Sequence, residues 1–257
     1  MSAGGARGRS RLERLVALSD PSWVADHAPP PRELVPGLWS VDRLLGIPAG
    51  PRIGTRMLLV ALPAGGVLAW SPVPLDAALR DFVLARGGAR YLVAPNSFHY
   101  LGLAEWKPAF PAAAIWFAPG LRARKPAVPA GEELQTGAST PFAETLPHRA
   151  LDCGRGVTEV AFLHAPSRTL MLVDSAFNLT PPARWLGRLA ARLVLGIPFR
   201  FGPTRSARLL LLRDRAVVAA WIDALCGWDF ERIVMAHGEP LAAGPRELRA
   251  AFARYLA

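Results

Sequence analysis

Short apolar runs separated by turn residues follow one another along most of the chain from Leu34 onward. Pairs of runs joined by short turns containing Pro, Gly or Ser predict two β-hairpins with largely buried strands. Single runs that end in polar residues predict further strands. Because hairpins are too frequent for a simple doubly wound sheet, we expect an α/β fold of two packed β-sheets covered by helices. The predicted hairpins span 56–70 and 159–173, and the single strands span 35–41, 91–94, 112–117 and 233–236.

Apolar residues recur at the helical period between these strands. The period predicts helices over 74–86, around 103–106, over 181–195, as one long helix over 204–226, and from Pro245 to the end. Residues 1–32 are rich in Gly, Ser, Arg and Pro and bury little apolar surface, so we expect a flexible tail. Residues 33–257 then form a single domain.

Composition and charge limit the classes of partner and the cellular compartment that we expect. Apolar residues make up 51% of the chain, enough for a large core, and Lys+Arg exceed Asp+Glu by 30 to 20. The arginines are scattered rather than gathered in a stripe with aromatic neighbours, so we expect no specific nucleic-acid partner. Cys153 and Cys226 follow no metal or redox pattern, which favours free thiols in a reducing compartment. Without a signal peptide or an uninterrupted membrane-length apolar run, the sequence predicts a cytoplasmic protein with no membrane span.

Three predicted strands end in potential metal ligands: His99 follows the strand at 91–94, Asp174 follows the second hairpin, and His237 follows the strand at 233–236. Two imidazoles and one carboxylate suit zinc, iron or manganese. Three protein ligands that leave a position open are typical of a catalytic metal. Taken singly, however, each residue has a structural alternative, because polar residues at strand ends often form turns.

Four segments together resemble the metallo-β-lactamase superfamily, and in particular an uncharacterised branch of it known as a domain of unknown function. The resemblance covers residues 34–257 and implies an αββα sandwich with its site along one edge of the sheets. The segments are Leu34-Val-Pro-Gly-Leu-Trp-Ser40, Ala94-Pro-Asn-Ser-Phe-His99 with Glu105-Trp106, Glu159-Val-Ala-Phe-Leu-His-Ala-Pro-Ser-Arg-Thr-Leu170 and Ala236-His-Gly-Glu-Pro240.

The chain departs from the hydrolases of that superfamily at the metal ligands. Their first loop has the pattern His-x-His-x-Asp-His, and a further histidine precedes the hairpin that delivers the Asp. With His99 on the last histidine, the other three positions are Ala94, Asn96 and Phe98, and no histidine stands near Arg155. The resemblance then implies that the first of the two family metal sites is lost, whereas the second keeps three of its four ligands.

Two hypotheses stay open. In the first, the protein is a one-metal hydrolase of a small-molecule substrate, in which His99, Asp174 and His237 bind one zinc, iron or manganese ion. Asn96 and Asp174 are then the catalytic candidates, with Asn96 orienting substrate or water. In the second, the pocket holds no metal and is a binding site or a structural remnant. Phe98 in place of an aspartate removes a charge that would offset a dication and so favours the second hypothesis slightly.

Three nearby polar residues receive structural interpretations. Glu159 opens a buried strand, which favours a salt bridge at the strand end over support of the site. His164 precedes Pro166 at a hairpin tip, so we expect it to be exposed to solvent. His148 lies before the position of the missing histidine and is predicted to be a loop residue.

Overall fold

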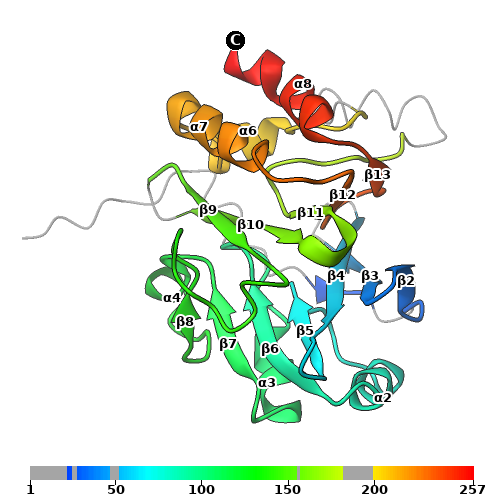
Figure 1. Cartoon of the computed structure of the whole chain (residues 1–257). Helices are drawn as coiled ribbons and strands as arrows, with labels where there is room; N and C mark the ends of the chain where they lie inside the picture. The colour runs from blue at the N-terminus through cyan, green and yellow to red at the C-terminus, as the bar shows by residue number, and fades with distance from the viewer. Residues whose placement is uncertain (1–21, 25–27, 47–51, 155–156, 182–198) are drawn as a thin grey trace, which may run out of the picture.

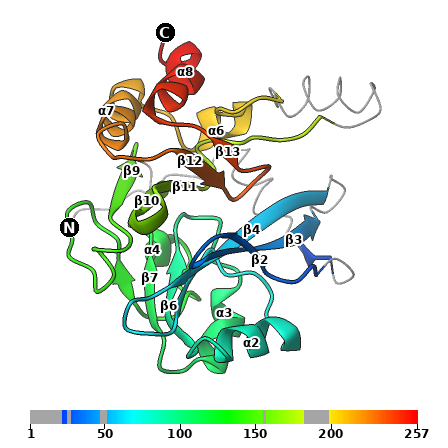
Figure 2. The same ribbon diagram turned by 45° about the vertical axis from the view of Figure 1, so that its right-hand side comes forward.

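The fold consists of two β-sheets packed face to face, with helices on both outer faces (Figures 1 and 2). The computed structural model describes residues 22–24, 28–46, 52–154, 157–181 and 199–257. Within these residues one sheet has eight strands and the other has five. The αββα sandwich predicted from the sequence is confirmed.

The eight-stranded sheet comes from the first half of the chain. Its strands follow the order β1-β3-β4-β5-β6-β7-β8, and β2 pairs with β3. Strands β1 to β5 pair in antiparallel fashion, whereas β5 to β8 run parallel to one another. The strands are β1 (Ser22–Trp23), β2 (Arg32–Val35), β3 (Leu38–Gly46), β4 (Arg52–Ala61), β5 (Val67–Trp70), β6 (Ala89–Ala94), β7 (Ala114–Phe117) and β8 (Glu132–Glu133).

The five-stranded sheet has the order β13-β12-β11-β10-β9. The predicted second hairpin forms its centre, and β12 lies parallel to β11. The carboxyl ends of β11 and β12 therefore lie at the same edge of this sheet, where α/β folds usually place their ligands. The strands are β9 (His148–Asp152), β10 (Thr158–His164), β11 (Thr169–Leu172), β12 (Arg232–Met235) and β13 (Leu241–Ala242).

Three apolar layers hold the sandwich together. The middle layer, between the sheets, joins residues such as Trp70 and Val93 to Phe162 and Val234. The outer layers pack α2 and α3 on the first sheet, and α6, α7 and α8 on the second. The helices are α2 (Ala77–Leu84), α3 (Leu103–Ala109), α4 (Leu121–Arg124), α6 (Arg205–Leu210), α7 (Arg215–Leu225) and α8 (Pro245–Leu256), with a 3-10 turn η1 (Ala165–Ser167).

Two sequence predictions about helices need comment. The single long helix over 204–226 is wrong: the chain forms α6 and α7, separated at Leu211–Asp214. The side chain of Asp214 accepts hydrogen bonds from the backbone N–H groups of Ala216 and Val217, so it caps α7 as a new helix. The helix predicted over 181–195 lies almost wholly outside the described residues.

The N-terminal segment contributes a short strand to the first sheet. Ser22–Trp23 pairs with Leu45 and Gly46 at the end of β3, and Trp23 packs against the outer core of that sheet. The boundary between tail and domain at residue 32 stays a prediction.

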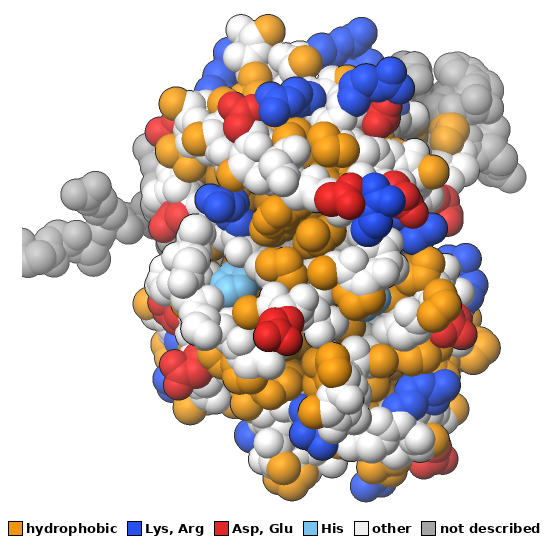
Figure 3. Space-filling view, viewed as in Figure 1, with side chains coloured by type: hydrophobic (Ala, Val, Ile, Leu, Met, Phe, Trp, Pro, Cys, Tyr) orange, Lys and Arg blue, Asp and Glu red, His pale blue; other side chains and the backbone are white. Residues whose placement is uncertain are grey.

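The surface mixes charges of both signs. On the face in Figure 3, the basic side chains of Lys and Arg are interspersed with carboxylates and apolar side chains. Arg168, for example, pairs with Asp229 at 2.6 Å and with Glu231 at 2.8 Å. Among the residues that the structure describes, no helix has the length and apolarity required to cross a membrane.

Candidate metal centre

The three predicted ligands meet at the edge where the two sheets come together. His99 lies in the loop that follows β6, Asp174 follows β11 and His237 follows β12. One potential ligand atom from each residue lies within 4.8 Å of the others. Residues separated by up to 138 positions in the sequence are thus brought to one point, as the pattern of strand ends predicts.

The separations of the donor atoms fit a single ion. Nε2 of His99 lies 3.2 Å from Nε2 of His237. Nε2 of His237 lies 3.2 Å from Oδ1 of Asp174. The other carboxylate oxygen, Oδ2, lies 3.6 Å from Nε2 of His99. Ligands at about 2.0–2.1 Å from one tetrahedral zinc lie about 3.3–3.4 Å apart, close to the separation of the two Nε2 atoms and to the distances from these atoms to the carboxylate oxygens of Asp174. The residue types and their spacing therefore fit one tetrahedral ion.

Hydrogen bonds on the far side of each imidazole hold its Nε2 toward this point. Nδ1 of His237 lies 2.7 Å from the backbone oxygen of Gly54, which can only accept, so this nitrogen carries the proton. Nδ1 of His99 lies 2.8 Å from Oγ of Ser71, just after β5. Ser71 has a φ of 59°, a conformation costly for residues other than glycine. Such outer partners orient the imidazoles of metal sites.

Asn96, a predicted catalytic residue, is buried and bonded to the ligand loop. Its Oδ1 accepts hydrogen bonds from the backbone N–H groups of Phe98 and His99, at 2.9 and 2.8 Å. Its Nδ2 donates to Oδ2 of Asp174 at 2.5 Å. With 1% of its surface exposed, Asn96 has little room to contact a substrate. Its contacts therefore favour a role in positioning Asp174.

Glu159 lies beneath Asp174 and makes no salt bridge among the described residues, contrary to the sequence interpretation. Its carboxylate accepts hydrogen bonds from the backbone N–H groups of Val173, Asp174 and Ser175 and from the Ser175 hydroxyl, at 2.6–3.0 Å. Complete burial and the nearby charge of Asp174 raise the pKa of Glu159 to about 7, although the hydrogen bonds oppose the shift. Glu159 thus fixes the backbone that carries Asp174.

Asp174 stays ionised in this setting. Burial alone would raise its pKa, but the charge of His99 and the hydrogen bonds from both histidines outweigh burial and hold the pKa well below its usual range. For His237, burial lowers the pKa, whereas the hydrogen bond and charge of Asp174 raise it, and the net direction is upward. The carboxylate and the two imidazoles are therefore electrostatically coupled.

Arg56, on β4, holds the turn that carries His237, a role that the sequence analysis did not identify. Its Nη1 donates to the backbone oxygens of Met235 and Gly238, at 3.1 and 2.6 Å, on either side of the histidine. Its Nε lies 2.8 Å from a carboxylate oxygen of Asp42 on β3. This buried guanidinium thereby ties the first sheet to the end of β12.

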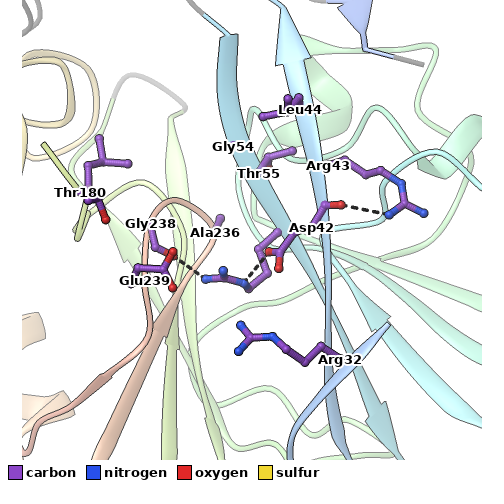
Figure 4. A pocket seen from close by; sticks show the side chains of 12 residues that line it. Arg32, Asp42, Arg43, Leu44, Gly54, Thr55, Thr180, Ala236, Gly238 and Glu239 are labelled. Atoms are coloured by element: carbon purple, nitrogen blue, oxygen red, sulfur yellow. Dashed lines mark hydrogen bonds and ion pairs between the residues drawn. The ribbon is translucent and has the colours of Figure 1, made fainter. Parts of the chain in front are cut away.

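A pocket of about 330 Å³ adjoins this turn. In Figure 4, Arg32 and Asp42 border it on the side of β2 and β3, and Gly238 and Glu239 form the opposite wall. Asp42 is paired with Arg56, and Arg43 is paired with Asp76. Arg32 and Glu239 leave opposite charges at its rim, so the pocket offers no single-sign binding surface.

The two other described histidines lie apart from the centre. His148 is on β9, not in a loop as predicted, and its Nε2 lies 3.0 Å from the backbone oxygen of Gln135. His164 is 2% exposed rather than solvent-facing, and its Nδ1 lies 2.6 Å from Oγ of Ser167. Burial lowers the pKa of His164 to about 4. Neither histidine replaces a ligand missing from the family pattern.

Only one of the two metal sites implied by the resemblance finds ligands. The second site has three donors in suitable positions, although Phe98 replaces its aspartate. The first site would draw on Ala94, which has no donor atom, and on Asn96, whose oxygen is turned toward the backbone. The remaining position falls at Arg155, outside the described residues. Among the residues that the structure describes, the donors therefore fit one ion, and Ala94 and Asn96 supply no ligand for a second.

Comparison with solved structures finds the same architecture in metallo-β-lactamases. The enzyme DIM-1, exposed to ceftazidime, has a TM-score of 0.59 and 12% identity over 90% of this chain and 100% of its own. A metallo-β-lactamase from Erythrobacter litoralis has a TM-score of 0.57 and 17% identity over 95% and 97%. FIM-1 from Pseudomonas aeruginosa, in its mono-zinc form, has 0.58 and 12% over 89% and 95%.

No protein-family model and no curated protein sequence matches the chain. At identities of 12–17% the structural likeness bears on the fold, and it extends over 89% or more of this chain. The chain has the metallo-β-lactamase fold.

Proposed function

We propose that this protein is a hydrolase that binds one divalent metal ion through His99, Asp174 and His237. The observation that carries the proposal is the convergence of the donor groups. The two Nε2 atoms lie 3.2 Å apart, Oδ1 of Asp174 lies 3.2 Å from Nε2 of His237, and Oδ2 lies 3.6 Å from Nε2 of His99, all close to the spacing of ligands around one tetrahedral ion. The mono-zinc form described for FIM-1 shows that a protein of this fold can hold a single zinc ion. A bound ion would supply hydroxide near neutral pH by lowering the pKa of a coordinated water.

The chain's own residues prepare this site before any ion arrives. In the neutral imidazole that a metal requires, the Gly54 carbonyl fixes the proton of His237 on Nδ1 and leaves the Nε2 lone pair facing the centre. The Ser71 hydroxyl likewise contacts Nδ1 of His99 and so restrains that ring with its Nε2 toward the centre. Asn96 and Glu159 hold Asp174 from two directions. Such preorganisation reduces the cost of ordering the ligands on binding.

Metal content is the decisive measurement. Protein purified after supplementation with Zn²⁺, Mn²⁺ or Fe²⁺ should contain about one ion per chain by elemental analysis. We expect His99→Ala and His237→Ala to lose it, and His148→Ala, whose imidazole lies elsewhere, to retain it. Hydrolysis of chromogenic esters, phosphodiesters and a β-lactam should then follow metal content.

The contacts within the cluster favour one alternative, a metal-free binding protein. The imidazoles of His99 and His237 lie within hydrogen-bonding distance of each other, and Asn96 donates to Asp174, so the polar groups can satisfy one another. In that case the supplemented protein contains no ion and His99→Ala leaves ligand binding intact. This outcome would refute the hydrolase proposal.

A further inference from the structure

The amide of Asn96 has a defined orientation. Two backbone N–H groups, those of Phe98 and His99, point at Oδ1 from 2.9 and 2.8 Å. An amide nitrogen in that position would face two donors, so the oxygen must occupy it. The NH₂ group therefore points at Oδ2 of Asp174, 2.5 Å away.

This orientation prevents Asn96 from being a metal ligand. An amide nitrogen has no lone pair available for a cation, and the oxygen already accepts two backbone hydrogen bonds. Ala94, two residues earlier, is fully buried and carries no donor. The sequence from Arg149 to Leu163 contains no histidine. Ala94 and Asn96 thus offer no ligand atom to a second ion beside Asp174, and the carboxylate of Glu159 already accepts four hydrogen bonds.

The NH₂ group also divides the two oxygens of Asp174 between different tasks. Oδ2 accepts the hydrogen bond from Asn96 at 2.5 Å and lies 3.6 Å from Nε2 of His99, while Oδ1 lies closer to an imidazole, 3.2 Å from Nε2 of His237, and accepts no bond from Asn96. Hydrogen bonds to a carboxylate oxygen fix the plane of the carboxylate and stabilise its charge. The amide thereby performs electrostatically, in part, what a second cation would do at that oxygen.

We propose that Asn96 is a positioning residue whose amide occupies the place of a second cation, so that the centre binds one ion only and Asp174 ligates it through a single oxygen. This inference rests on the proposed one-metal centre. It gives Asn96 a role different from orienting substrate or water.

The test is metal stoichiometry and affinity, measured by isothermal titration with Zn²⁺ and by elemental analysis after dialysis. Wild-type protein should saturate at one ion per chain. Asn96→Leu removes the amide without adding a ligand, and it should still take one ion but bind it about 10–100-fold more weakly. Asn96→Asp keeps an oxygen for the two backbone N–H groups and turns a second oxygen toward Asp174, so we expect it to take up a second ion.

Gln135→Glu is the matched control, because it makes the same amide-to-carboxylate change at an exposed position. It should leave both stoichiometry and affinity as in wild type. Two ions in wild type, unchanged affinity in Asn96→Leu, or a single ion in Asn96→Asp would each overturn the inference and leave the metal centre standing. If wild type binds no ion at all, both the proposed function and the inference fail. If Asn96→Leu does not fold, the isosteric Asn96→Asp decides.

Discussion

Glu159 positions the backbone of Asp174, and we expect substitution of its carboxylate to destabilise the protein strongly. It is completely buried and accepts four hydrogen bonds, three of them from consecutive backbone N–H groups at 173–175. The substitution Glu159→Gln preserves size but replaces one acceptor oxygen with an NH₂ group. Because the Ser175 hydroxyl can reverse its role and accept, the least costly orientation places NH₂ beside that hydroxyl and Val173.

The expected loss can be worked out from these contacts. In that orientation one backbone N–H, that of Val173, loses its acceptor and faces another donor, which costs about 1–3 kcal/mol. The two remaining bonds weaken because their acceptor is no longer charged, at about 0.5–1 kcal/mol each. Removal of a buried charge returns part of this, as the raised pKa of Glu159 indicates. We expect a net loss of about 2–3 kcal/mol in the free energy of unfolding.

Urea unfolding followed by tryptophan fluorescence and circular dichroism measures that free energy. Ser175→Ala removes only the 2.6 Å hydroxyl bond and should cost about 1 kcal/mol, so it remains measurable if Glu159→Gln is too unstable. The double variant should lose less free energy of unfolding than the sum of the losses in the two single variants, because the two side chains share one hydrogen bond. A loss below about 1 kcal/mol for Glu159→Gln would refute the account of this network.

Three further predictions follow from other side chains. Arg56→Met should lower the free energy of unfolding by about 2–3 kcal/mol and weaken Zn²⁺ binding in a calorimetric titration, because the carbonyls flanking His237 lose their donor; unchanged Zn²⁺ affinity would contradict this role. Ser71→Gly should be about 1 kcal/mol more stable than Ser71→Ala in chemical denaturation, because glycine accepts a φ of 59°; equal stability would show that the backbone there is unstrained. Burial lowers the pKa of His164 to about 4 in the folded protein, from an ordinary value of 6.5. Between these pH values only the unfolded chain binds the proton, so the free energy of unfolding should fall by on the order of 1–3 kcal/mol as the pH drops from 6.5 to 4. The urea midpoint of His164→Gln should depend less on pH over this range than that of the wild type.

The sequence predicted the strands better than the helices. Buried strands leave apolar runs that turns delimit, and both hairpins and the three strand ends with ligands follow from that pattern. The break between α6 and α7 escaped prediction because apolar residues continue on both sides of it. The signal was present in Asp214, a favoured residue at the start of a helix. Its ability to cap outweighed the continuity of the apolar pattern.

The ligands could be proposed from sequence, whereas most of the residues that position them could not. Arg56 binds backbone oxygens 179 and 182 residues away, and such partners leave no local pattern. Glu159 bonds to a turn that lies beyond the next hairpin strand. Both residues nevertheless carried one signal: each is a charged side chain immediately before an apolar run in the sequence. A charge that enters a core requires partners there, even when the sequence does not identify them.

The positioning residues also explain why the centre lies where it does. His99 comes from the first sheet, whereas Asp174 and His237 come from the second, so the ligands meet only if the sheet edges are held in register. Backbone bonds provide that register: the N–H of Arg56 donates to the oxygen of Ala236 at 2.8 Å, and the N–H of Val160 donates to the oxygen of Pro95 at 2.7 Å. Those bonds flank the ligands on both sides. The contacts that join the two sheets at this edge are thus the same contacts that fix the ligands, and an ion bound only by the folded form would in turn stabilise the junction of the sheets.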